Sequence, residues 1–385
     1  MLARFVLLYA AMYAAYGVAS PFLPAFVSSR GIAPEELGLV LGAGTAVRLV
    51  SAPLAGRLGD LFGALRTVLV LCIALAAFTT LGYLPAKGFW WFLAISMMQA
   101  AALAPMTVLA DALTLGAAAR ARFEYGWVRG TGSGAFIIGT LASGQAIAVA
   151  GLGVIVGLQA SLLGLAALAA ALVPELPHPS RATASRHRIG ELLRLPVYRN
   201  LVIVAALVLG SHAMQDAFAM IRWRAAGVSA GLGSLLWSEA VLAEVLVFFF
   251  LGPRLVQMLT PAGALALAAL AGMVRWTVMA TSADVPALAL VQPLHGVTFA
   301  LLHLACMRLI GRAVPPGLEG SAQALYGTGI GSAAAIVTFG SGALYGRLGA
   351  GGFWLMAALC AAALPFAWRV ARAWARDSAR SSARQ

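Results

Sequence analysis

The sequence predicts an all-α membrane protein with twelve transmembrane helices, arranged as two pseudo-symmetric bundles of six. Three observations predict this class: the composition, the length of the apolar runs and the placement of the basic residues. Of the 385 residues, 62% are hydrophobic and only 10% are charged. A soluble chain would carry about 25% charged residues.

The apolar runs are continuous and long enough to cross a bilayer. A spanning helix needs about 20 mostly apolar residues, and its backbone groups must be hydrogen-bonded within the helix because lipid offers no partners. A transmembrane barrel would show alternating apolar and polar residues instead. We expect spans at residues 5–27, 36–56, 66–84, 89–111, 128–150, 152–173, 200–220, 233–252, 262–281, 285–307, 320–343 and 352–370.

The basic residues fall mainly on one side of this arrangement. An even number of spans places both termini on the same side, and 18 of the 26 Lys and Arg residues would lie there, against five on the other. By the positive-inside rule, both termini are expected to be cytoplasmic, in a multi-pass protein of the inner (plasma) membrane. This distribution also explains the net charge of +13 without nucleic acid as a partner.

A polar stretch from Pro174 to Leu195 divides the chain near its middle. We therefore expect a first six-helix bundle at 1–174, a cytoplasmic linker at 175–198, a second bundle at 199–370 and a basic cytoplasmic tail at 371–385.

An internal repeat supports two related halves. The order Tyr125-Gly126, Gly130, Gly132, Ser133 recurs about half a chain later as Tyr326-Gly327, Gly329, Gly331, Ser332. Two such halves, related by an axis along the membrane normal, are a known transporter architecture. We expect close helix packing at six glycines: Gly130, Gly132, Gly134, Gly327, Gly329 and Gly331.

Several ionisable residues fall inside the apolar runs, where each costs about 2.5–3.5 kcal/mol on insertion scales and is usually functional. They are Arg48, Asp111, Arg129, His212, Asp216, Glu239, Glu244, Arg275, His295 and His303. Asp111 ends one span and Arg129 opens the next, so the two can meet. Their pairing could serve a substrate or only lock the hairpin.

A second group of these residues lies in the C-terminal half. His212 and Asp216 are four residues apart, which places them on one face of a helix. Imidazole and carboxylate groups suit proton relay, because neighbours can move their pKa values toward neutrality. The alternative is a set of hydrogen-bonded packing residues.

No pattern for an enzyme or a receptor is present. The cysteines Cys72, Cys306 and Cys360 have no metal-site spacing, and no nucleophile and base or soluble signalling domain can be recognised. We expect no catalytic residues, no metal and no cofactor.

The segment 56–66 resembles the loop signature of the major facilitator superfamily. Its matching residues are Gly56, Arg57, Gly59, Asp60, Gly63 and Arg66. We expect a tight cytoplasmic turn in which Asp60 caps the next helix or meets an arginine, while Arg57 and Arg66 lie at the headgroups.

An ordered set of further segments resembles the phenylpropionate-permease and lactose-permease branch of that superfamily, whose members are proton-coupled importers of small organic solutes. The set comprises Phe123 to Arg129, Ser211-His212-Ala213, Leu236-Trp237 with Ala243-Glu244, Val274-Arg275-Trp276, and Gln292 to Phe299 with His303-Leu304-Ala305.

The resemblance implies roles for particular residues. Asp111 and Arg129 would bind substrate, and we add Tyr13, Tyr16 and Trp237 as candidate contacts. Arg275 and His295 match members of a proton-coupling cluster, Glu244 lies close to its essential acid, and we add His212 and Asp216.

The sequence departs from lactose permease at two points. Thr298 stands where that protein has a carboxylate, and residues 320–343 contain no lysine. The proton-carrying acid is therefore open between Glu244 and Asp216. Arg48 is typical of the phenylpropionate-like group and could be structural or functional.

We thus expect a secondary active transporter that works by alternating access, as a monomer in the lipid bilayer. The first hypothesis is proton-coupled symport of a small organic solute, which could be an aromatic or other carboxylate, a sugar or a nucleoside. The alternative is an exporter of amphipathic compounds that works by proton antiport.

Overall fold

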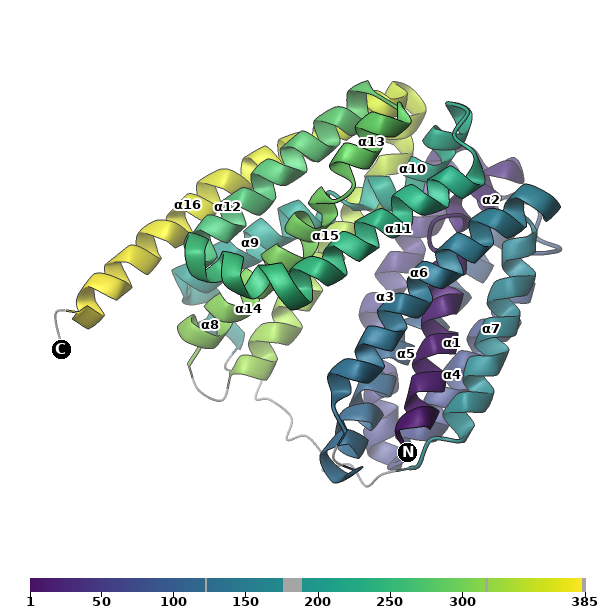
Figure 1. The fold of residues 1–385 in the computed structure, drawn as a ribbon, viewed down its shortest axis with the longest axis horizontal. Helices are drawn as coiled ribbons and strands as arrows, with labels where there is room; N and C mark the ends of the chain where they lie inside the picture. Colours follow the sequence, from purple (N-terminus) through teal and green to yellow (C-terminus); the bar gives the residue numbers. More distant parts are fainter. Residues whose placement is uncertain (122, 176–188, 316–317, 383–385) are drawn as a thin grey trace. The chain divides into compact units, whose positions relative to one another are not determined.

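The computed structural model describes residues 1–121, 123–175, 189–315 and 318–382, and these ranges contain helices and no strand (Figure 1). The first half contains α1 (Leu2–Ala19), α2 (Leu23–Ser29), α3 (Pro34–Phe62), α4 (Leu65–Leu81), α5 (Gly88–Ala121), α6 (Tyr125–Ala150) and α7 (Val154–Ala171). The second half contains α8 (Ile189–Arg194), α9 (Pro196–Gly210), α10 (Ala213–Ala225), α11 (Ala230–Leu246), α12 (Gly252–Thr281), α13 (Val285–Val291), α14 (Leu302–Ala313), α15 (Glu319–Leu348) and α16 (Phe353–Ser382). Each predicted span coincides with one or more of these helices.

Within the described ranges, nine helical stretches are long and apolar enough to cross a membrane. Two of them, Ala230–Thr281 and Glu319–Arg376, each contain two predicted spans, and the apolar helix Leu65–Leu81 is shorter. Within Ala230–Thr281 the chain turns at Thr260, which has φ 60° and ψ 157°. The Thr260 hydroxyl accepts a hydrogen bond from the Gly263 N–H at 3.3 Å, as a helix N-cap does. The turn falls between the predicted spans 233–252 and 262–281.

The chain forms two compact units. Unit 1 comprises Met1–Arg181, Asp216–Ser238 and Thr338–Gly346, and unit 2 comprises Ala182–Gln215, Glu239–Val337 and Arg347–Gln385. Most of the expected linker 175–198 lies outside the described residues, which resume with α8. Most of the expected tail 371–385 is helical, because α16 continues to Ser382.

In unit 1, α1 packs against α6 and α7 (Figure 1). Glycines let α1 and α6 approach closely. A Cβ added at Gly17 would lie 2.1 Å from the Phe136 carbonyl oxygen, and one at Gly139 would lie 2.4 Å from that of Ala14. The Thr140 hydroxyl also donates to the Gly17 carbonyl at 3.0 Å.

The glycines of the internal repeat pack less closely than expected. An added Cβ at Gly132 would lie 2.9 Å from the Tyr13 ring, and one at Gly329 would lie 2.9 Å from Val202. A Cβ added at Gly130, Gly134 or Gly327 would have no atom of a neighbouring helix within 4 Å. The prediction of close packing is therefore wrong for these three. Sequence spacing gives no information on which face of a helix meets a neighbour.

We expect Gly139→Ala to destabilise unit 1 and Gly134→Ala to leave it unchanged, although both lie on α6. The added methyl at 139 would meet backbone, which cannot move aside, and overpacking of this kind costs about 1–3 kcal/mol. Thermal unfolding in detergent would show a lower melting temperature for Gly139→Ala alone. Equal melting temperatures for both variants would contradict the close approach of α1 and α6.

The loop-signature segment is mostly helical, which corrects the expected turn. α3 continues to Phe62, and only Gly63, with φ 58°, takes the left-handed conformation that ends a helix. Arg66 forms an ion pair with Glu175, with 3.4 Å between Nε and Oε2. Arg66 thus joins α4 to the segment after α7 and is not simply a headgroup contact. The side chain of Asp60 lies outside the described residues.

In unit 2, α12 packs against α16, α14 and a π-helix at Gly296–Leu301, labelled η3. A second π-helix, η2, follows α11 at Val247–Leu251. π-Helical turns are rare and occur frequently at functional sites. Because a π-helical turn contains an extra residue, the residues before and after it do not lie on the helix faces that a simple α-helical spacing predicts.

Candidate functional site

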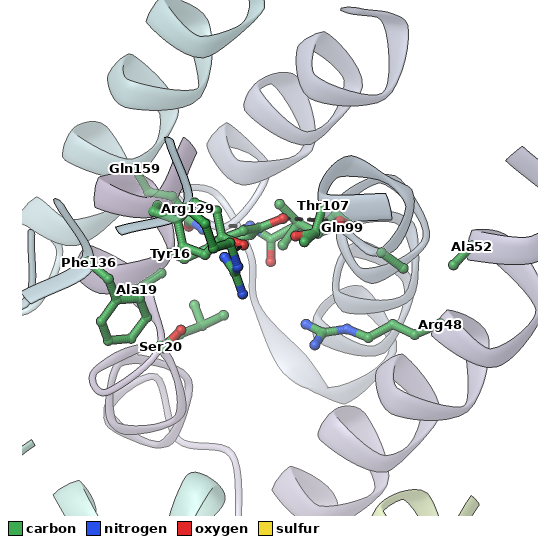
Figure 2. Close-up of a pocket in the computed structure, with 14 residues that line it drawn as sticks. Tyr16, Ala19, Ser20, Arg48, Ala52, Gln99, Thr107, Arg129, Phe136 and Gln159 are labelled. Atoms are coloured by element: carbon green, nitrogen blue, oxygen red, sulfur yellow. Dashed lines mark hydrogen bonds between the residues drawn. The ribbon is translucent and has the colours of Figure 1, made fainter. Parts of the chain in front are cut away.

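Unit 1 contains a cavity of about 550 Å³ among α1, α3, α5, α6 and α7 (Figure 2). Its lining combines cations, neutral polar groups and aromatic rings. The main members are Arg48, Arg129, Gln99, Thr107, Gln159, Tyr13, Tyr16 and Phe136. Tyr13, Tyr16 and Arg129, which the sequence proposed as substrate contacts, are therefore brought together here.

The two arginines reach the cavity from different helices, Arg48 from α3 and Arg129 from α6, and both point into the same opening (Figure 2). The Arg129 guanidinium donates to the Tyr13 hydroxyl, and its carbon lies 4.7 Å from the centre of the Tyr13 ring. No acidic residue lines this cavity, and no described carboxylate forms an ion pair with either arginine. The cavity is therefore strongly electropositive.

Asp111 has a different environment from the one expected. Its carboxylate accepts hydrogen bonds from the Tyr9 hydroxyl and, at 2.9 Å, from the Tyr125 hydroxyl. It does not line the cavity and does not pair directly with Arg129 among the described residues. The hydrogen bond between Tyr125 and Asp111 joins α5 to the start of α6. The contact that links the two helices of the hairpin is therefore made by a tyrosine and not by Arg129.

Two buried amides complete the polar part of the cavity. Gln99 and Gln159 are each 3% exposed. The Gln99 amide nitrogen donates to the Thr80 hydroxyl at 2.8 Å and to the Gln159 side-chain oxygen at 3.4 Å. Sequence reasoning missed this pair, although a glutamine inside an apolar run is a usable signal, because buried amides need partners.

Trp237 does not line the cavity. Its indole packs against Trp223, with 6.5 Å between ring centres, and both rings are buried. Its proposed contact with substrate stays a prediction.

Unit 2 contains a partly buried cluster of ionisable side chains around His295. The His295 Nε2 lies 3.3 Å from the Glu244 carboxylate, and its Nδ1 lies 3.1 Å from an Arg275 nitrogen. Arg275 is completely buried and also donates to the Gln292 side-chain oxygen at 2.9 Å. Three predicted proton-coupling residues, Glu244, Arg275 and His295, are thus in direct contact.

The contacts of His295 determine its tautomer. A guanidinium can only donate hydrogen bonds, so Nδ1 must be the acceptor and carries no proton. Nε2 then carries the proton and faces the Glu244 carboxylate. A second proton on His295 would break its bond to Arg275, so the group in this contact that is free to take up a proton is Glu244.

His212 extends the cluster. Its Nε2 lies 3.0 Å from the Thr298 hydroxyl, and its ring centre lies 5.3 Å from that of His295. Thr298 stands where lactose permease has a carboxylate, so this chain has a neutral hydroxyl there, which also donates to the His295 backbone carbonyl at 3.3 Å.

Asp216 does not share a helix face with His212 as expected. α9 ends at Gly210, α10 begins at Ala213, and the two residues between them form a turn. His212 belongs to unit 2 and is buried, whereas Asp216 belongs to unit 1 and is exposed.

The tyrosines of the internal repeat make matching contacts. Tyr125 donates to Asp111 of the preceding span, and the Tyr326 hydroxyl lies 3.5 Å from His303 Nδ1, also of the preceding span. The repeat thus preserves a contact between a tyrosine and an ionisable group in both halves.

Comparisons with known proteins agree with this geometry. The MFS_1 like family model matches residues 2–357. The chain is 33% identical over 365 residues to a "Probable 3-phenylpropionic acid transporter" of Escherichia coli (strain K12), covering 91% of this chain and 92% of that protein.

Solved structures share the fold at low identity. The nucleoside transporter NupG matches with a TM-score of 0.81 at 13% identity, covering 96% of this chain and 98% of NupG. A bacterial homologue of the human lysosomal transporter Spinster, in an inward-facing and unoccupied conformation, matches with a TM-score of 0.72 at 14% identity, covering 98% of this chain and 97% of that one.

The helical fold of the described residues, with its long apolar helices, the electropositive cavity and these matches agree on one assignment. The chain belongs to the MFS_1-like family of the major facilitator superfamily and is a multi-pass membrane transporter of a small-molecule substrate, not an enzyme.

Proposed function

We propose that the protein imports a small aromatic carboxylate together with a proton, across the inner membrane and with both termini in the cytoplasm. The observation that carries the substrate class is the pair of guanidiniums, Arg48 and Arg129, in a cavity lined by no acid.

The charge balance of the cavity supports an anionic substrate. Arginine inside a membrane is costly and normally pairs with an acid. Arg129 is hydrogen-bonded to Tyr13, and its positive charge is also attracted by the negative charge of Asp111. Arg48 has no comparable partner among the described carboxylates. A substrate carboxylate supplies the missing negative charge, and a guanidinium binds it through two parallel hydrogen bonds.

The remaining lining supports an aromatic body on that substrate. Tyr13, Tyr16 and Phe136 provide ring surface, and the Gln99 and Gln159 amides suit a polar substituent. A volume of about 550 Å³ falls in the usual range for sites of small organic ligands. The relative's name, "Probable 3-phenylpropionic acid transporter", refers to a molecule of this kind, an aromatic ring carrying one carboxylate.

The cluster in unit 2 supports proton coupling. Glu244 is a partly buried carboxylate that faces the protonated nitrogen of His295, while Arg275 holds the other nitrogen. Glu244 can alternate between a charged and a neutral form without rearranging the histidine. We assign the proton to Glu244 and a positioning role to Arg275, His295 and His212.

Transport by purified protein in liposomes tests this function. With the liposome exterior acidic, labelled 3-phenylpropionate should accumulate, and 3-phenylpropionamide should compete with it only at a much higher concentration. The same liposomes without the gradient should only equilibrate the label. Uptake that is indifferent to the pH gradient would rule out proton coupling, and equal competition by the amide would rule out carboxylate recognition.

A further inference from the structure

Unit 2 contains a second electropositive cavity, between α9 and α16, that the transport function does not use. It has a volume of about 440 Å³, and α9 and α16 pack directly against each other. Four arginines line it: Arg199, Arg369, Arg372 and Arg376.

The arginines of α16 lie on one face, because Arg369, Arg372 and Arg376 follow the helical spacing of three and four residues. Arg199 adds a fourth guanidinium from the first turns of α9. Asn200, which is only 6% exposed, lines the same cavity and adds an amide. No acid is present in this lining, so the described side chains leave the cavity with uncompensated positive charge.

The position of the cavity along α16 matches the edge of a bilayer. Arg369 and Arg376 follow the first residue of the helix, Phe353, by 16 and 23 residues. At about 1.5 Å per residue they lie about 24 and 35 Å along the helix. The hydrocarbon core is about 30 Å thick, so the cavity falls at the boundary between acyl chains and headgroups.

An aromatic side chain at the cavity favours a lipid over a soluble anion. Trp368 is 55% exposed and lines the cavity beside Arg372, whose guanidinium carbon lies 3.5 Å from the centre of the indole. Tryptophan is typical of the membrane interface, where it contacts lipid with its apolar ring. Basic pockets between transmembrane helices on the cytoplasmic side suit anionic headgroups.

We propose that this cavity binds the phosphate diester headgroup of an anionic phospholipid. The four guanidiniums hold the phosphate oxygens, and Trp368 contacts the glycerol backbone and the first acyl carbons. The site belongs to unit 2 and is separate from the cavity that we assign to substrate.

Native mass spectrometry of the full chain with phosphatidylglycerol and phosphatidylcholine tests the site. The wild type should retain phosphatidylglycerol preferentially. The variant R369Q/R372Q/R376Q should lose this preference, by about fivefold for each arginine removed. The matched control R30Q/R120Q/R254Q removes the same charge from exposed arginines outside the cavity and should retain it.

Two further measurements keep the result decisive. Melting temperatures without lipid establish that both variants are folded, and the single variant R372Q replaces the triple variant if the latter does not fold. Equal loss of lipid in both triple variants, or no loss in R369Q/R372Q/R376Q, would overturn the site. Inorganic phosphate or glycerol phosphate that raises the melting temperature as much as phosphatidylglycerol does would identify a soluble anion as the ligand and overturn the lipid assignment.

Discussion

Replacing Arg48 by glutamine is expected to weaken binding of 3-phenylpropionate about 10- to 100-fold. Hydrogen bonds to charged groups contribute about 1.5–3 kcal/mol, and each 1.4 kcal/mol is a factor of ten in Kd. The neutral 3-phenylpropionamide, measured by the same calorimetric titration of purified protein, should bind the variant and the wild type equally. This difference between two ligands of similar shape isolates the carboxylate.

Two matched variants sharpen the measurement. Arg48→Lys keeps the charge but loses the planar pair of donors, so its affinity should fall between those of the wild type and Arg48→Gln. Arg30→Gln removes an exposed arginine that does not line the cavity and should bind both ligands normally. Wild-type affinity of Arg48→Gln for the acid would remove Arg48 from the site. Equal loss for acid and amide would indicate that Arg48 only shapes the cavity.

Replacing Glu244 by glutamine is expected to abolish accumulation driven by a proton gradient. One pH unit corresponds to 1.36 kcal/mol per proton, so a carrier moving one proton per substrate should accumulate it about tenfold. Glutamine keeps an oxygen to accept the hydrogen bond from His295 but cannot bind and release a proton. The variant should therefore reach only equilibrium in liposomes, while exchange of labelled for unlabelled substrate continues.

Glu239→Gln provides the control, because it makes the same change on the same helix, α11, outside the His295 cluster. It should accumulate substrate as the wild type does. Asp216→Asn separates the two acids that the sequence left open. If Asp216→Asn loses accumulation and Glu244→Gln keeps it, the proton is carried by Asp216 and the assignment to Glu244 is wrong.

The positions of the spans and the ionisable residues could be predicted from the sequence, because both depend on the cost of polar groups in lipid. Arg129, Glu244, Arg275 and His295 stand out in apolar runs for this reason. Their partners follow from contacts between helices, which one-dimensional spacing does not contain. The bond between Tyr9 and Asp111 is an example, since the two residues are 102 positions apart.

Local irregularities account for the other differences. The turn at Ser211 and His212 and the π-helix at Gly296–Leu301 both change the helix face on which later residues lie. An ideal helical spacing drawn through these points therefore pairs the wrong residues, as it did for His212 and Asp216. Arg48 could be recognised as a buried cation, but its role depends on the absence of an acid around it, which only the cavity lining shows.

The placement of the guanidiniums in one unit and the carboxylate–imidazole cluster in the other has an electrical consequence. If Arg48 receives one carboxylate and Glu244 one proton, the loaded carrier has the same net charge as the empty one. Moving an elementary charge across 100 mV involves about 2.3 kcal/mol, but a neutral cycle would involve none of it. Such uptake would depend on acidity outside the cell and would continue in a cell whose membrane potential has collapsed.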